Sequence, residues 1–168
     1  MVRKIVLRIQ KKKINWLFIP ALLLTIAACS HSSVYSNYKS IADAGWNKDS
    51  VARFTVDITE TGIPCNVLVN IRHNNTYPYQ NFWMFITTTT PDGKSTQDTI
   101  ECYLADNRGK WLGSGLSSIY NMPVLFKPNT VFTKPGKYTF AIRQGMRDDV
   151  LPGISDIGIE IDKANQKK

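Results

Sequence analysis

Cys29 is the residue whose neighbours define its chemistry most clearly. It follows Ile26, Ala27 and Ala28, and small residues before a cysteine match a bacterial lipobox, where a peptidase cuts a lipoprotein precursor. Sulfur at the new N-terminus is the nucleophile that takes up a diacylglyceryl group. The sequence therefore predicts lipid attachment at Cys29.

The segment before Cys29 has the composition of an export signal. Residues 1–13 hold six of the 21 Lys and Arg residues, and residues 14–28 form an apolar run. A membrane-spanning helix needs about 20 apolar residues, so this run is short for a permanent span. Without residues 1–28 the chain has 15 cations and 13 acids, which argues against a nucleic-acid partner.

An acylated Cys29 is expected to hold the protein on a membrane, because two or more chains, palmitate among them, bind more firmly than one. Ser30 follows the cysteine, where Asp would favour retention in the inner membrane, so the outer membrane is expected. The next residues contain no acidic run of the kind that directs some lipoproteins to the cell surface. This favours the periplasmic leaflet.

Two further cysteines, Cys65 and Cys102, lie on expected inward faces of strands. In an oxidising compartment they could form a disulfide, which typically contributes about 2–4 kcal/mol. The alternative is two buried free thiols that pack as small hydrophobic groups. These cysteines and the two histidines lack the spacing of metal ligands, so we expect no metal and no other cofactor.

Three further groups of residues could do chemistry, but none forms a catalytic set. His73 has no nucleophile or orienting carboxylate that its spacing identifies. The glycines of residues 109–115 lack phosphate-loop spacing, so we expect a loop with Trp111 packed on the domain. Asp148 and Asp149 are adjacent carboxylates of the kind found in solvent. We therefore predict that the protein is not an enzyme.

Aromatic residues support a second hypothesis, in which they form a stacking platform for sugar rings on a glycan-binding domain. The candidates are Trp46, Tyr77, Tyr79, Trp83, Tyr103 and Trp111. Packing in the core and at its rim is the simpler role for such side chains. The glycan-binding hypothesis requires Trp83 or Trp111 to be exposed on a flat face.

These residues lie on segments in which apolar residues recur with a period of two, as in half-buried β-strands. The expected strands are 51–59, 63–72, 82–90, 98–105, 119–126, 137–143 and 156–162. Turn-forming residues separate them, whereas residues 144–150 are expected to form a turn or loop rather than a helix. About eight short strands are typical of a single antiparallel β-sandwich, Ig-like or jelly-roll-like.

The expected organisation has four parts: a signal peptide (1–28), a lipidated tether (29–48), an all-β sandwich (49–162) and a solvated tail (163–168). The tether is rich in Ser, Asn and Lys. Tyr35, Tyr38 and Trp46 leave open an alternative in which part of it forms an edge strand on the domain.

Taken in order, several segments resemble the gliding-motility lipoprotein GldH family. Besides Cys29, they are residues 34–41, 45–50, 69–86, 91–93, 98–101, 104–115 and 146–159. Cys65 and Cys102 are not part of that pattern. The resemblance implies an envelope lipoprotein needed for gliding and for the machinery that moves adhesins, which is linked to type IX secretion. It implies no catalytic residues.

We therefore expect an outer-membrane lipoprotein that acts as a non-enzymatic scaffold. Its expected partners are the membrane, through acyl chains on Cys29, and other envelope lipoproteins and motility or secretion proteins. The alternative is a glycan-binding module of the cell envelope.

Overall fold

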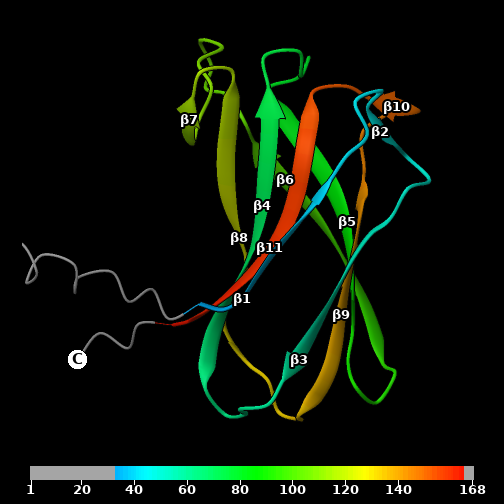
Figure 1. Cartoon of the computed structure of the whole chain (residues 1–168), viewed down its shortest axis with the longest axis vertical. Coiled ribbons are helices and arrows are strands. Elements are labelled where there is room, and N and C mark those ends of the chain that lie inside the picture. The colour runs from blue at the N-terminus through cyan, green and yellow to red at the C-terminus, as the bar shows by residue number, and fades with distance from the viewer. Residues whose placement is uncertain (1–32, 165–168) are drawn as a thin grey trace, which may run out of the picture. The chain divides into compact units, whose positions relative to one another are not determined.

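The computed structural model describes residues 33–164 (Figure 1). The predicted signal peptide and Cys29 lie outside the described residues. The described part contains eleven strands and no helix, and thus no helix that could span a membrane. The strands are β1 (Ser33–Ser40), β2 (Trp46–Asn47), β3 (Ala52–Ile58), β4 (Pro64–Asn74), β5 (Asn81–Thr89), β6 (Ser95–Tyr103), β7 (Ser114–Leu116), β8 (Ile119–Val131), β9 (Gly136–Gln144), β10 (Val150–Leu151) and β11 (Ile154–Lys163).

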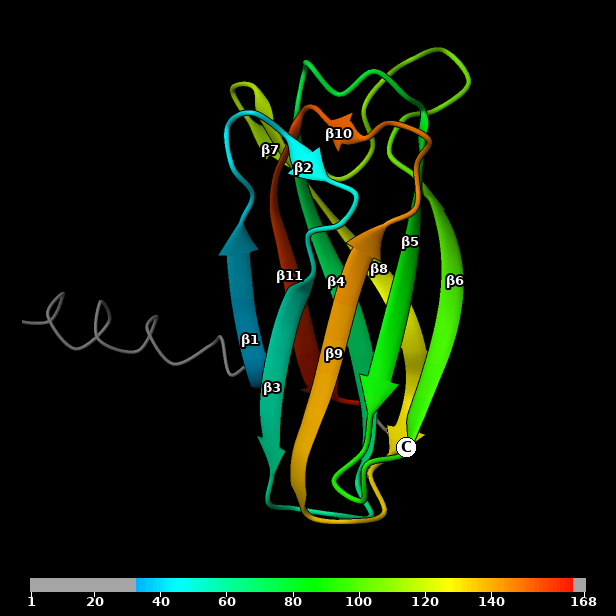
Figure 2. The same cartoon turned by 90° about the vertical axis from the view of Figure 1, so that its right-hand side faces the viewer.

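The strands form two antiparallel sheets packed face to face (Figures 1 and 2). One sheet has the order β1-β11-β4-β8-β7 and the other has the order β3-β9-β5-β6. The short strands β2 and β10 pair with each other across one end. The prediction of an all-β antiparallel sandwich is confirmed, and residues 145–149 are a loop, as expected.

The eight longer strands pair in a nested order. The first pairs with the last, β1 with β11, and moving inward β3 pairs with β9, β4 with β8 and β5 with β6. The chain is thus one long antiparallel hairpin rolled into two sheets. This is a jelly-roll arrangement, the second of the two sandwich types that the sequence left open.

The core follows the period-two pattern read from the sequence. In β3, Ala52, Phe54, Val56 and Ile58 are buried, and the residues between them are exposed. The inward faces of β9 and β11 are also buried, and each large apolar side chain contributes about 1.5–3 kcal/mol by burial. Central strand β5 buries one face fully and leaves Trp83, on the other, 38 % exposed.

The expected tether is wrong from residue 33 onward. Residues 33–40 form edge strand β1, which pairs with β11, and Trp46 of β2 is only 1 % exposed. The polar composition of this segment predicts a tether, but it also fits an edge strand, because an edge strand exposes most of its side chains and needs few apolar contacts. The edge-strand alternative describes residues 33–40 correctly.

The two ends of the sandwich differ. We call the end where β1 begins and β11 ends the N-terminal end; it carries the loops 59–63, 90–94 and 132–135. We call the opposite end, uppermost in Figure 1, the distal end. It carries β2, β10 and the longer connections 75–80, 104–113 and 145–149.

Candidate docking surface at the distal end

Two buried aromatic residues hold the loops of the distal end. Trp46 packs against Phe82, with ring centroids 6.0 Å apart, and its Nε1 donates to the Ser50 carbonyl at 3.2 Å. Tyr77 is buried, and its hydroxyl donates to the Asn81 carbonyl at 2.7 Å. Burial raises the pKa of Tyr77 above its usual value, so the hydroxyl stays a donor. Both rings are structural.

His73 lies in a cage of aromatic rings beneath these loops. It is fully buried, stacks on Tyr120 at 5.4 Å, and meets the edge of Trp111 at 4.6 Å. Nδ1 lies 3.4 Å from the Asn74 carbonyl, and Nε2 has no partner. Burial lowers the pKa of His73. No hydrogen bond among residues 33–164 joins this imidazole to a nucleophile or a carboxylate, so the structure gives it no general-base geometry.

The glycine-rich segment is a packed loop, as the sequence predicts. Trp111 is half-buried and its Nε1 donates to Asn75 Oδ1 at 3.0 Å. The Asp106 carboxylate accepts from the backbone of Arg108 and Lys110, both at 2.9 Å. These bonds hold the loop in a turn. Because the Asp106 carboxylate already accepts from these backbone N–H groups, they are not free to bind a phosphate.

Three exposed aromatic residues lie together here, Tyr79 in the connection 75–80 and Trp83 and Tyr103 on the outer face of β5 and β6. Tyr79 is 37 % exposed, Trp83 is 38 % exposed and Tyr103 is 54 % exposed. Tyr103 lies opposite Asn81 in the β5–β6 register, diagonal to Trp83. Diagonal neighbours on one face lie within reach of large rings. We call these three residues, with the hollow described next, the aromatic surface.

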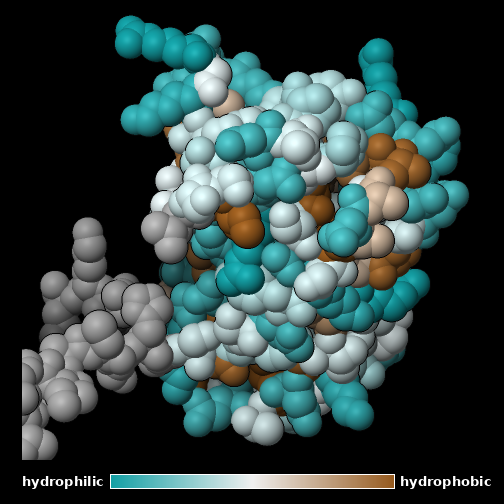
Figure 3. All heavy atoms as spheres, turned by 45° about the horizontal axis from the view of Figure 1, so that its top comes forward, coloured by the Kyte–Doolittle hydropathy of each residue, from teal (hydrophilic) through white to brown (hydrophobic). Residues whose placement is uncertain are grey.

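A hollow of about 330 Å³ lies between Tyr79 and Trp83, and Asn81, Met146 and Arg147 complete its wall. Figure 3, in which the top of Figure 1 comes forward, shows a mostly hydrophilic surface with apolar spheres in small groups, the clearest of them at the right. Polar groups border the rings: Asn81 Nδ2 donates to Glu101 at 2.6 Å. Ring, sulfur and guanidinium groups of this kind are enriched in binding interfaces.

Asp148 positions one ring of this surface. The Tyr79 hydroxyl donates to Asp148 Oδ2 at 2.8 Å, and this bond raises the pKa of Tyr79. Asp149 instead pairs with Lys48, and its side chain is 79 % exposed. Asp149 is solvated as predicted, whereas Asp148 has a structural role that its sequence neighbours do not reveal.

The six aromatic candidates do not form one platform. Tyr79, Trp83 and Tyr103 are exposed, Trp46 and Tyr77 are buried, and Trp111 is half-buried. Met146 and Arg147 were missed by sequence reasoning. They reach the surface because the loop after β9 lies against the start of β5, where the Gly145 amide donates to the Trp83 carbonyl at 2.7 Å.

Cys65 and Cys102 are both free, so the disulfide is not formed. Cys65 is near the start of β4, at the N-terminal end, and Cys102 pairs with Phe82 near the distal end. The period-two alternation predicts that both side chains face inward. It does not predict how far along the sandwich each one lies, so it could not show that they are at opposite ends. Burial raises the pKa of both thiols, that of Cys102 to about 12. Within residues 33–164, no three His, Cys, Asp or Glu side chains gather as metal ligands.

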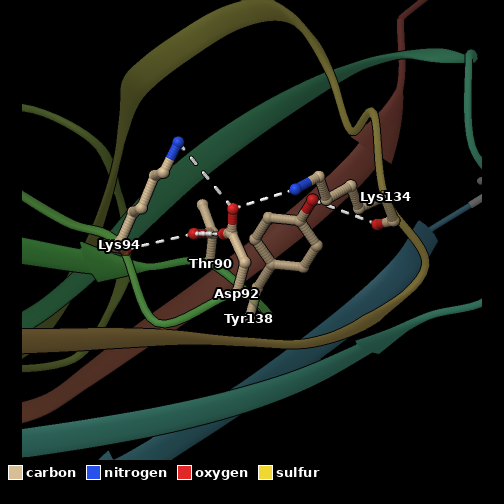
Figure 4. Close-up of polar contacts among 5 residues, drawn as sticks. All are labelled: Thr90, Asp92, Lys94, Lys134 and Tyr138. Carbon is tan, nitrogen blue, oxygen red and sulfur yellow. Dashed lines mark hydrogen bonds and ion pairs between the residues drawn. The ribbon is translucent and has the colours of Figure 1, made fainter.

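The N-terminal end is closed by a small ionic cluster (Figure 4). Asp92 accepts from Thr90 and from Lys134, whose Nζ lies 2.9 Å away, and Lys94 lies at 4.0 Å. The bonds from Thr90 and Lys134 lower the pKa of Asp92 to about 2. Tyr138 adds a bond from its hydroxyl to the Lys134 carbonyl at 3.0 Å. This cluster joins two turns, β5–β6 and β8–β9.

The fold and the surface define a two-sheet jelly-roll protein with an exposed aromatic surface at one end. Comparison with known proteins identifies the group: the profile of the GldH lipoprotein family matches residues 33–161, and the chain belongs to this family. Membership implies attachment to a membrane by lipid.

Two relatives span nearly the whole chain. The gliding motility lipoprotein GldH homolog of Christiangramia forsetii is 34 % identical over 150 residues, covering 85 % of this chain and 91 % of the relative. The gliding motility lipoprotein GldH of Flavobacterium johnsoniae is 32 % identical over 154 residues, covering 88 % of this chain and 94 % of the relative. Both names are those of lipoproteins and not of enzymes.

Solved structures show only distant likeness. The subviral particle of infectious bursal disease virus VP2 aligns with a TM-score of 0.33 and 13 % identity, over 78 % of this chain. This chain spans 30 % of that protein.

Proposed function

We propose that this protein is an outer-membrane lipoprotein that supports gliding motility as a non-enzymatic scaffold. Its lipid is carried by Cys29 in the periplasmic leaflet, and its domain docks on envelope proteins of the motility and type IX secretion machinery, which displays adhesins. Family membership and the names of two relatives support the motility role. The lipobox at Cys29 supports the anchor.

The aromatic surface is the single observation that carries the docking role. It lies at the distal end, opposite the end at which β1 begins. Three residues lie between Cys29 and Ser33, so the chain from one to the other spans at most about 14 Å. An anchor this short holds the N-terminal end near the membrane and leaves the distal end to neighbouring proteins.

Three long segments of the family resemblance also contribute to the distal end. Residues 69–86 include the connection 75–80 and Trp83, residues 104–115 form the loop around Trp111, and residues 146–159 begin in the wall of the hollow. Segments far apart in sequence therefore meet where docking is proposed.

Deletion of the gene tests the proposed role first. Loss of colony spreading and of adhesin display is expected, and normal behaviour on both counts would contradict the role. A Cys29→Ala chain should fail to restore spreading, because it lacks acyl chains. Mass spectrometry of the N-terminal peptide from the unaltered protein should find those chains on Cys29.

Substitutions on the aromatic surface test docking directly. Trp83→Ala and Tyr103→Ala should reduce crosslinking to envelope proteins in intact cells, because exposed rings contribute strongly at interfaces. Leu125→Ala is the matched control, since Leu125 is 53 % exposed on β8 of the other sheet. Equal crosslinking by all three variants would assign docking to another face.

Glycan binding is the second candidate, favoured by the exposure of Trp83 beside Tyr79. Sugar rings stack on aromatic faces, and the side chains of Asn81 and Arg147 could bond to hydroxyl groups. Retention of the protein on envelope polysaccharide, lost in Trp83→Ala and kept in Leu125→Ala, would favour this candidate. Absence of retention would exclude it.

A further inference from the structure

A second hollow, unrelated to the aromatic surface, opens at the N-terminal end between the two sheets. Its volume is about 320 Å³, within the range of small-molecule pockets. The apolar part of its wall consists of Val34, Ile58, Ile63, Cys65 and Phe132. We call it the N-terminal pocket.

The wall of the N-terminal pocket favours an apolar ligand. Of the residues that line it, only Glu60 and Lys163 are charged, and they pair with each other at 3.0 Å. Their side chains are 66 % and 44 % exposed, so the pair lies at the solvent side. The Cys65 thiol already donates to the Ile63 carbonyl at 3.5 Å. No lining side chain offers a buried polar atom that lacks a partner.

The position of the pocket along the chain indicates what fills it. Ser33, the first residue of β1, lies in the pocket wall. Cys29 is only four residues earlier, so its acyl groups begin at most about 14 Å of chain from the mouth. A ligand tethered so closely has a high effective concentration at the pocket.

We propose that the N-terminal pocket holds one acyl chain of the lipid on Cys29. The inference rests on the proposed lipidation of that residue. A cysteine with three chains can place one in the pocket and keep two in the bilayer, and two chains suffice for firm anchoring. The bound chain would press the N-terminal end of the domain against the membrane and fix its orientation, so that the distal end points away from the lipid.

Photocrosslinking of the intact lipoprotein tests this proposal. Cells grown with a diazirine-bearing palmitic acid analogue incorporate the label into the anchor and into phospholipids, and irradiation precedes purification and peptide mapping. We expect covalent links between the Cys29 lipopeptide and peptides containing residues 58–65 or 131–133. A link from the same peptides to a phospholipid alone would assign the pocket to a membrane lipid and overturn the proposed source.

Pocket-filling variants supply the control. Ile63→Trp and, independently, Val34→Trp should abolish the links while leaving Cys29 labelled, and Leu125→Trp, on the outer face of β8, should retain them. A labelled Cys29 without links to the pocket contradicts this inference alone. An unlabelled Cys29 contradicts the proposed anchor, and with it the inference.

Discussion

At the N-terminal end short turns carry exposed ion pairs beside one buried aromatic pair, Phe132 and Tyr138, whereas at the distal end longer loops pack on a larger set of buried rings. Asp92 and Lys134 represent the first kind of closure, and Trp46, Tyr77 and His73 represent the second. Solvent-exposed ion pairs contribute little to stability, and buried rings contribute much.

This difference explains how one end of the sandwich can expose large aromatic rings without losing its fold. Tyr79 and Trp83 can remain exposed at the distal end because Tyr77 and Phe82, their neighbours in sequence, are buried beneath them. The ring centroids of Tyr77 and Phe82 lie 6.1 Å apart. Packing therefore fixes the backbone that carries the exposed rings.

Removal of a buried ring at the distal end should have the largest effect. Trp46→Ala is expected to lower the free energy of unfolding by about 3–5 kcal/mol, as for other large-to-small core changes. Trp83→Ala, at the same end but on the surface, should cost far less. Urea denaturation of both variants measures the contrast, and equal losses would show that burial does not separate the two tryptophans.

A methyl group added at Gly153 should have the next largest effect. Its φ is +82°, and a Cβ there would lie 2.3 Å from the Tyr77 backbone nitrogen. Gly153→Ala should therefore cost about 1–3 kcal/mol from the backbone conformation, with the clash in addition. Gly93 is the matched control at the N-terminal end, because its φ is +81° and no atom lies within 4 Å of the added Cβ.

The difference between Gly153→Ala and Gly93→Ala isolates the close approach between loops. Thermal and urea denaturation should both rank Gly153→Ala as the less stable variant. Equal losses of stability in the two variants would mean that only the backbone conformation matters at both positions.

The sequence predicts the faces of the strands well and their arrangement poorly. Period-two alternation identifies inward residues such as Phe54 and Ile159 because burial on one face acts residue by residue. The pairing of β1 with β11 joins residues more than a hundred positions apart. The local sequence pattern contains no information about which distant strands pair. The same limit left open whether Cys65 and Cys102 form a disulfide or remain two buried free thiols, and the structure has the free thiols.

Outward faces are a second limit of prediction. Asn70 lies between the inward-facing Val69 and Ile71 in the alternation of β4, yet it is 1 % exposed and donates to Glu160 at 2.7 Å. Its neighbour Arg72 lies 4.0 Å from the ring of Tyr38 on β1. A predicted tether thus covers part of the sheet, and no residue of β4 indicates this.

His73 should make the distal end sensitive to mild acid. Its pKa in the folded protein is below the unfolded value of about 6.5, so the unfolded chain binds more protons. Stability should be complete above that value and should fall as the pH drops from 7 to 5. His73→Phe, which keeps a ring in the cage, should flatten this slope in urea denaturation. An unchanged slope would assign the sensitivity to another group.

Asp92 should make the N-terminal end sensitive only to stronger acid, and its effect should be the smallest because the ion pair is exposed. Its pKa falls from 3.8 to about 2 on folding, so the stabilisation is complete above the unfolded value and is lost as the pH drops from about 4 to 2. Asp92→Asn should flatten the slope in that range only, and His73→Phe should leave it intact. Each variant is therefore the control for the other. If Asp92→Asn also altered the slope between pH 7 and 5, the two ends would be coupled, and the contrast between ionic and aromatic closure would fail.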